Sequence, residues 1–191
     1  MAALHAGIAP LWHVPVEQYH SLIDQGILGP DDRVELLEGI IVQKMSKNPP
    51  HSTATGFTRS RLEQVIPPNW HVRTQEPITL QSSEPEPDVA VIRGDPRTYA
   101  RRHPGPRDIG LVVEVSDTTQ DRDRIIKKRI YATAGIPFYW LLDLNRRKLE
   151  TYSEPKGSEY AHTAEYSEHE SVAVILDGVT VGSVAVSDLL P

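Results

Sequence analysis

Residues 109–143 read IGLVVEVSDTTQDRDRIIKKRIYATAGIPFYWLLD, and they carry the clearest strand and helix signals in the chain. The apolar run from Ile109 to Val115 is typical of a buried strand. Thr119 to Ala134 is predicted to form a helix that ends at a glycine. Pro137 to Asp143 is predicted to be a second, aromatic-rich strand. A helix set between two strands indicates that all three pack around one sheet.

The rest of the chain continues this mixture of helices and short strands. Helices are expected from Val16 to Gly26 and from His51 to about Ile66, and strands over Trp70 to Thr74 and Val89 to Arg93. One hairpin is expected over Val34 to Val42, and a second is expected between the strand Pro137 to Asp143 and Lys148 to Ser153. Further strands are expected between Tyr160 and Val186. The apolar face of the second helix is expected to include Ala54, Phe57, Leu62, Val65 and Ile66. This order of elements predicts an α/β (α+β) class, a mixed sandwich around one sheet.

The composition excludes several classes of protein. The chain has 191 residues and no cysteine, so disulfides, zinc–thiolate sites and thiol nucleophiles are ruled out. No run of about 18 apolar residues is present, so no membrane span is expected. The first residues do not resemble a signal peptide, so a cytoplasmic protein is expected. The net charge of -6 argues against a non-specific nucleic-acid coat, which needs a basic face.

Two carboxylates stand at the margins of apolar strands. Asp88 comes just before the strand predicted at Val89 to Arg93, and Glu114 lies near the end of the strand predicted at Ile109 to Val115. A charge at such a position is costly unless it is paired or bound to a metal. On neighbouring strands, the two carboxylates would provide hard oxygen ligands for Mg²⁺.

The following helix offers a positive charge close to these carboxylates. Asp123, Lys127 and Tyr131 are spaced four apart, so they share one helix face. The helix begins soon after the strand that holds Glu114, and Lys127 could therefore reach that carboxylate. Phosphodiester hydrolysis needs a metal to activate water and a cation beside the developing charge. Lys128 is rotated by about 100° from Lys127 and is expected to face solvent.

Each of these residues also has a simpler interpretation when it is taken alone. A Pro-Asp pair usually marks a turn, and a lone helix lysine is usually exposed. The order of the three charged groups together favours a metal-dependent site. Zinc hydrolysis is disfavoured because no His-Glu-x-x-His pattern occurs, and a serine hydrolase is disfavoured because no Gly-x-Ser-x-Gly elbow occurs.

The charged residues occur in an order that resembles a known family. Pro87-Asp88, Glu114-Val115-Ser116, Asp123 to Lys127, and the stretch from Tyr131 to Trp140 follow one another as in the restriction-endonuclease-like family within the PD-(D/E)XK nuclease superfamily. The likeness also includes Glu35-Leu36-Leu37-Glu38-Gly39 and His51. It implies one restriction-endonuclease-like domain over residues 1–191, with a mixed sheet flanked by helices, a core at about 15–155 and C-terminal strands over 156–191.

The resemblance also implies a chemistry. Mg²⁺ or Mn²⁺ would be held by Asp88 and Glu114, the substrate would be DNA, and the protein would act as a homodimer. The superfamily pattern expects a lysine two residues after the glutamate, where this chain has Ser116. The resemblance makes Lys127, on the following helix, the natural substitute.

Further site residues are suggested by the N-terminal part of the resemblance. Glu35 or Glu38 would supply another carboxylate, and Glu38 is favoured slightly because the turn at Gly39 could aim it inward. His51 would orient the start of its helix near the site, or assist as a proton carrier. A member of the fold that has lost catalysis and serves as a binding or regulatory module is the alternative.

A long basic loop separates the two strands that carry the carboxylates. Residues 96–108 include Arg97, Arg101, Arg102 and Arg107. Loops of this length are often functional. We expect this loop to contact phosphates if the protein binds DNA, and the alternative is a solvated surface.

Overall fold

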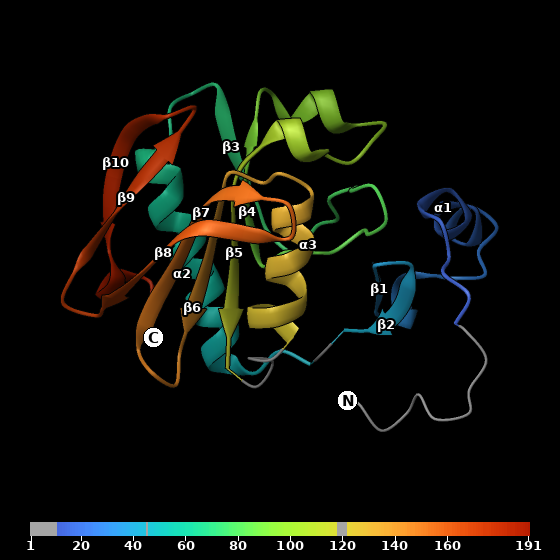
Figure 1. Ribbon diagram of the computed structural model, residues 1–191, viewed down its shortest axis with the longest axis horizontal. Coiled ribbons are helices and arrows are strands. Elements are labelled where there is room, and N and C mark those ends of the chain that lie inside the picture. Colours follow the sequence, from blue (N-terminus) through green and yellow to red (C-terminus); the bar gives the residue numbers. More distant parts are fainter. Residues whose placement is uncertain (1–10, 45, 118–121) are drawn as a thin grey trace.

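A six-stranded sheet forms the centre of the computed structural model, which describes residues 11–44, 46–117 and 122–191. The strands of this sheet, in spatial order, are β3 (Trp70–Arg73), β4 (Val89–Arg93), β5 (Ile109–Ser116), β6 (Phe138–Asp143), β7 (Lys148–Lys156) and β8 (Glu159–Ser167). Within it, β5 and β6 are parallel, and the other neighbours are antiparallel. The predicted mixed sheet flanked by helices is therefore confirmed (Figure 1).

The strand β5 lies in the middle of the sheet, and all eight of its residues are buried. Side chains alternate between the two faces of a strand. Val113 and Val115 pack into one core, whereas Val112 packs into the core on the opposite face. By this alternation Glu114 and Ser116 share a face with Val112.

The segment between β5 and β6 covers the face that Glu114 shares. It consists of a π-helical stretch (Arg122–Lys127) and α3 (Lys128–Thr133), and Tyr131 is fully buried against the sheet. The predicted helix is confirmed from residue 122 onward, and residues 118–121 lie outside the described part. The side chain of Asp123 lies outside it as well.

The opposite face of the sheet is covered by α2 (Pro49–Val65) and by a hairpin of β9 (Ser171–Leu176) and β10 (Val179–Ala185). Asn48 caps α2 by accepting a hydrogen bond from the His51 backbone N–H at 3.0 Å. The predicted place of Phe57 on the inner face is wrong, because this side chain is 45% exposed. The buried row runs through Ala54, Thr58 and Leu62 at four-residue spacing instead.

The N-terminal part forms a small unit beside the main sheet (Figure 1). It contains α1 (Val16–Asp24) and the hairpin of β1 (Val34–Leu37) and β2 (Ile40–Gln43), which turns at Glu38-Gly39 as predicted. The backbone N–H of Glu84 donates to the Leu36 carbonyl at 2.7 Å, which ties β1 to the segment leading into β4. This contact brings the β1 side chains close to the sheet.

None of the helices in the described part of the chain is both long enough and apolar enough to span a lipid bilayer.

Candidate active site

The two carboxylates predicted as metal ligands lie at the same end of the sheet. Asp88 directly precedes β4, and the antiparallel pairing of Val89 with Val113 places Asp88 level with Glu114 on β5. The Asp88 Oδ2 atom accepts a hydrogen bond from the Val115 backbone N–H at 2.9 Å. Both carboxylates are buried, with residue exposures of 7% and 2%.

Glu114 is held by two side chains from the following helix. Lys127 Nζ lies 2.9 Å from Glu114 Oε1, and the Tyr131 hydroxyl donates to the same oxygen at 2.6 Å. Lys127 is the last residue of the π-helical stretch, and such stretches are frequent at functional sites. Lys128, one residue on, lies instead within 3.6 Å of Glu159 at the surface.

A third carboxylate reaches the same lysine from β1. Glu35 Oε2 lies 3.7 Å from Lys127 Nζ and accepts a hydrogen bond from the Glu86 backbone N–H at 3.2 Å. Glu38, which the sequence favoured slightly, has a φ of 50° in the hairpin turn and pairs with Arg129 at 2.9 Å near the surface. The structure therefore brings Glu35 rather than Glu38 to the carboxylate cluster.

His51 approaches Asp88 from the first turn of α2. Its Nε2 lies 3.1 Å from Asp88 Oδ2, so the helix start and the head of β4 are joined at the site. The other ring nitrogen, Nδ1, is buried and has no hydrogen-bond partner among the described residues. His51 thus lies where it can orient Asp88, as predicted, through its Nε2 atom.

The local environment favours opposite protonation states for two of these groups. Burial alone would raise the pKa of Asp88, but the hydrogen bond and charge of His51, the charge of Lys127 and the Val115 N–H hold it below its usual value. Burial and the neighbouring Glu114 charge raise the pKa of Tyr131 well above its usual value. Asp88 is therefore an anionic oxygen donor, and Tyr131 remains a neutral hydrogen-bond donor.

Ser116 occupies the position where the superfamily pattern places a lysine. It is fully buried, and its Oγ has no hydrogen-bond partner among the described residues. A serine there supplies no positive charge, so the cation of the cluster comes from Lys127 on the helix. The residue next to Ser116, Asp117, accepts a hydrogen bond from the Asn48 side chain and so links the end of β5 to α2.

A second lysine near the site was not predicted from the sequence. Burial lowers the pKa of Lys47, while the charges of Asp88 and Glu86 act to raise it. Lys47 therefore lies within electrostatic range of the carboxylate cluster. Its only signal in the sequence is its position between a hairpin and a Pro-capped helix, which is too common to single it out.

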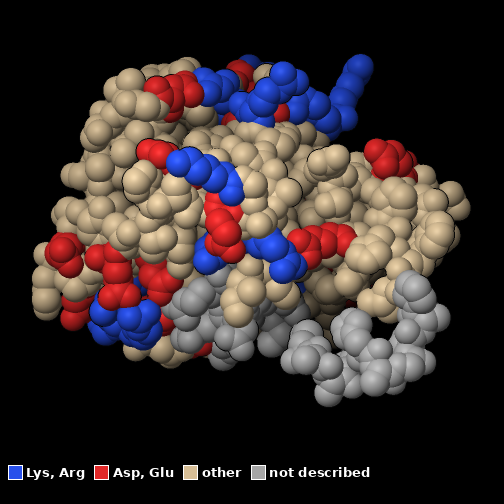
Figure 2. All heavy atoms as spheres, in the orientation of Figure 1, with Lys and Arg blue, Asp and Glu red and all other residues tan. Residues whose placement is uncertain are grey.

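The basic loop lies at the other end of these strands. It follows β4 and precedes β5, whereas Asp88 precedes β4 and Glu114 lies near the end of β5. The five residues of β4 separate the loop from Asp88 by about 17 Å along the strand. Figure 2 shows Lys and Arg side chains along the upper edge of the molecule, where the turns between β4 and β5 lie in Figure 1. Arg97, Arg101, Arg102 and Arg107 are exposed there, away from the carboxylates.

The donor set at the carboxylate cluster fits a hard divalent cation. Among the described residues, no three His, Asp or Glu side chains already form a metal cage. Mg²⁺, however, is usually bound by one or two carboxylates together with several waters. Asp88 and Glu114 provide two such carboxylates at one end of the sheet, and Glu35 lies beside the same lysine as Glu114.

A mixed sheet with acidic side chains and a lysine gathered at one end defines a restriction-endonuclease-like fold. The chain belongs to the Uma2 family, described as "Putative restriction endonuclease", whose match covers residues 16–185. The fold is similar to the crystal structure of a "putative nuclease belonging to DUF820" from Anabaena variabilis ATCC 29413, with a TM-score of 0.71. That match has 17% sequence identity and covers 92% of this chain and 97% of the other. No curated protein matches the sequence significantly.

Proposed function

We propose that this protein is a metal-dependent endonuclease that hydrolyses phosphodiester bonds in DNA. The observation that supports it most is the position of Lys127, whose Nζ lies 2.9 Å from Glu114 and 3.7 Å from Glu35 in a buried cluster. Burying these charges is costly, and it gives no clear benefit to folding alone. Phosphodiester hydrolysis needs a metal held by oxygen ligands and a cation beside the developing charge, and this cluster offers groups for both.

Asp88 and Glu114 are the proposed ligands of Mg²⁺ or Mn²⁺. When bound, the metal would polarise the phosphate and lower the pKa of a water. The Val115 N–H and His51 orient the Asp88 carboxylate, and the Tyr131 hydroxyl fixes Glu114. Fixed ligands need little reorganisation during the reaction, which is the main advantage of a preorganised site.

Lys127 is the proposed catalytic cation, and Glu35 keeps it in place. Its ammonium would stabilise the negative charge that develops on the phosphate oxygens. Tyr131 remains protonated, so it acts as a hydrogen-bond donor and not as a base. His51, whose Nε2 lies 3.1 Å from Asp88 Oδ2, is the accessory candidate for proton transfer.

The proposed substrate is DNA, cut by a homodimer in the cytoplasm. The dimer follows by analogy, since two identical sites related by a twofold axis suit the two strands of a duplex. The exposed arginines between β4 and β5 are too far from the carboxylates to touch the bond that is cut. Their proposed role is to contact phosphates elsewhere along the duplex.

A calorimetric titration with Mg²⁺, combined with cleavage assays on several DNA forms, tests the proposal. Wild type should bind the metal and cut DNA, whereas Asp88→Ala should lose both properties. The Asp177→Ala variant is a suitable control, because Asp177 is an exposed aspartate paired with Arg93. Equal metal binding by wild type and Asp88→Ala would contradict the proposed ligands.

The second candidate is a catalytically inactive nuclease fold that serves as a binding or regulatory module. It is favoured by Ser116, which replaces the strand lysine, and by the ion pair that already neutralises part of Glu114. This candidate would be preferred if wild type bound DNA but cut none of the DNA forms with either Mg²⁺ or Mn²⁺.

A further inference from the structure

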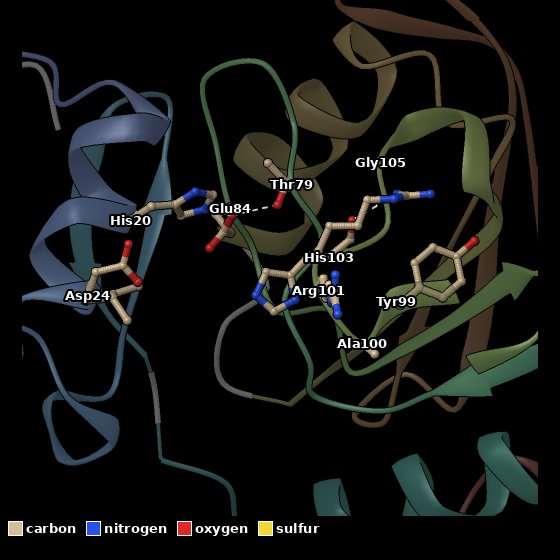
Figure 3. A pocket seen from close by; sticks show the side chains of 11 residues that line it. His20, Asp24, Thr79, Glu84, Tyr99, Ala100, Arg101, His103 and Gly105 are labelled. Atoms are coloured by element: carbon tan, nitrogen blue, oxygen red, sulfur yellow. Dashed lines mark hydrogen bonds and ion pairs between the residues drawn. The ribbon is translucent and has the colours of Figure 1, made fainter. Parts of the chain in front are cut away.

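A cleft of about 740 Å³ lies between α1, the segment before β4 and the loop between β4 and β5. Figure 3 shows His20 and Asp24 on one side of it and Arg101, His103 and Tyr99 on the other, with Glu84 between them. Its size falls within the range of small-molecule sites. The cleft shares no lining residue with the carboxylate cluster.

A buried carboxylate with one uncommitted oxygen forms the floor of the cleft. The Glu84 side chain is only 2% exposed, and its Oε2 lies 2.6 Å from His20 Nε2 and 2.7 Å from Thr79 Oγ1. The other oxygen, Oε1, accepts no hydrogen bond from the residues that the structure describes. An ionised carboxylate oxygen accepts hydrogen bonds and cannot donate them. The cleft therefore suits a ligand that brings an N–H or O–H group.

One wall of the cleft carries a cation that has no partner in the described part of the chain. Arg102 is committed to Asp108, with a closest approach of 2.6 Å, and lies 4.9 Å from the centre of the Tyr99 ring. Arg101, by contrast, is exposed, lines the cleft and makes no ion pair with any described residue. A free guanidinium recognises phosphate through paired hydrogen bonds.

An aromatic ring and an aliphatic side chain complete the lining. The Tyr99 hydroxyl donates to the Arg93 carbonyl at 2.6 Å, which fixes the ring at the wall. Ile23 of α1 lines the cleft as well and is 44% exposed. Apolar parts of a ligand can contact such a lining.

We infer that this cleft binds one nucleotide, with its phosphate on Arg101 and an N–H or O–H of its base or sugar on Glu84 Oε1. Carboxylates accept hydrogen bonds from base amino groups in this way. The inference deepens the proposed nuclease function, and it rests on that function where the nucleotide belongs to a DNA strand. The nucleotide is either free or part of a DNA strand that also reaches the carboxylate cluster.

The chain itself connects the two sites. Glu84 and Asp88 are four residues apart in a segment that pairs with β1 at Leu36, so their Cα atoms lie at most about 14 Å apart. A strand cut beside Asp88 could therefore place a neighbouring nucleotide in the cleft. Arg101 could then hold the phosphate of that neighbouring nucleotide, although its loop is too far from the carboxylates to contact the bond that is cut.

Binding measured without divalent metal separates the cleft from catalysis. Deoxynucleoside monophosphates and a short single-stranded oligonucleotide are titrated into the full chain and followed by calorimetry. Arg101→Ala should weaken binding about tenfold or more, the usual scale for a charge-assisted hydrogen bond. Arg59→Ala is the matched control, since Arg59 is an exposed arginine of α2, its side chain is 54% exposed and it does not line the cleft.

Two further variants test the geometry of the cleft. Ala100→Trp fills the space without changing any charge and should abolish binding. Glu84→Gln keeps an acceptor oxygen while it removes the charge, and it should alter which nucleotide is preferred. Each variant is first compared with wild type by circular dichroism, and Ala100→Trp provides the test if Glu84→Gln does not fold.

The outcomes show whether the nucleotide is free or part of a DNA strand. They also test the cleft inference separately from the nuclease proposal. Arg101-dependent binding of the oligonucleotide alone identifies a DNA strand, and binding of the monophosphates alone identifies a free nucleotide. Failure of both to bind, or an equal loss in Arg59→Ala, would overturn the inference even if the protein cuts DNA. Conversely, Arg101-dependent binding in a protein that cuts no DNA would leave the cleft assigned and the nuclease proposal rejected.

Discussion

Lys127 and Lys128 are neighbours in sequence, but their surroundings differ completely. Lys127 is buried against Glu114, whereas Lys128 is partly exposed, near Glu159 and over the Tyr152 ring, and does not face the carboxylates. We expect Lys127→Ala to reduce DNA cleavage by about 10²-fold or more, the usual effect of losing one charge-stabilising group. Lys128→Ala should retain wild-type cleavage. Similar rates in both variants would show that Lys127 is not the catalytic cation.

Lys127→Ala, which should slow DNA cleavage, should strengthen metal binding. Removing the ammonium of Lys127 leaves Glu114 and Glu35 without their shared counter-charge, so a divalent cation should bind more tightly. Titration of wild type and Lys127→Ala with Mg²⁺ checks this expectation. Weaker binding in Lys127→Ala would mean that the lysine builds the metal site and does not merely border it.

Tyr131 offers a milder test of the same cluster. Tyr131→Phe keeps the ring in its buried position but removes the hydroxyl that donates to Glu114 at 2.6 Å. A hydrogen bond to a charged group contributes about 1.5–3 kcal/mol, so the free energy of unfolding should fall by roughly that amount. Urea denaturation measures the change, and Tyr160→Phe serves as a control for loss of a buried tyrosine hydroxyl away from the cluster.

At the scale of single elements, α2 is asymmetric in a way that its sequence does not show. Leu62 is fully buried, whereas Phe57 is 45% exposed beside the C-terminal residues. Leu62→Ala should destabilise the protein by about 2–5 kcal/mol because it leaves a cavity in the core. Phe57→Ala should cost much less, and the two midpoints of urea unfolding provide the comparison. Equal losses would mean that Phe57 is covered in solution.

The ion pair between Arg102 and Asp108, in the loop between β4 and β5, should respond to pH in a predictable way. The hydrogen bond from Arg102 is the main cause that lowers the pKa of Asp108, and the Gly105 N–H adds to it. Because the folded-state pKa is depressed, this contact stabilises the loop above the usual Asp pKa of about 3.9 and is lost as the pH falls through the folded value. Asp108→Asn should loosen the loop at neutral pH, and faster hydrogen exchange at Gly105 would reveal it.

At the scale of the whole molecule, metal binding and folding should be coupled. A ligand that binds only the folded state stabilises it by about 2.7 kcal/mol at a concentration of 100 times Kd. Mg²⁺ should therefore raise the melting temperature of wild type, and chelation should reverse the rise. Asp88→Ala should show no such shift. A shift of equal size in this variant would place the metal elsewhere.

Sequence reasoning was most successful where a local pattern and its chemistry agree. The strand at β5 and the helix after it follow from apolar runs and turn residues, and these elements carry Glu114 and Lys127. The choice between Glu35 and Glu38 could not be made this way, because it depends on how a hairpin docks on a distant segment. Phe57 shows the same limit, since the inner face of a helix is set by what covers it. Lys47 and the position of the basic loop also depend on tertiary contacts.

The carboxylate cluster draws its groups from four separate stretches of the chain, at residues 35, 88, 114 and 127. These stretches meet only when β1, β4, β5 and the helix after β5 have all come together. Contacts so distant in sequence form late, because the intervening loops must close first. A ribosome-bound chain that has not yet exposed residue 127 therefore lacks the complete set. The proposed cutting activity could therefore arise only once synthesis has passed that point.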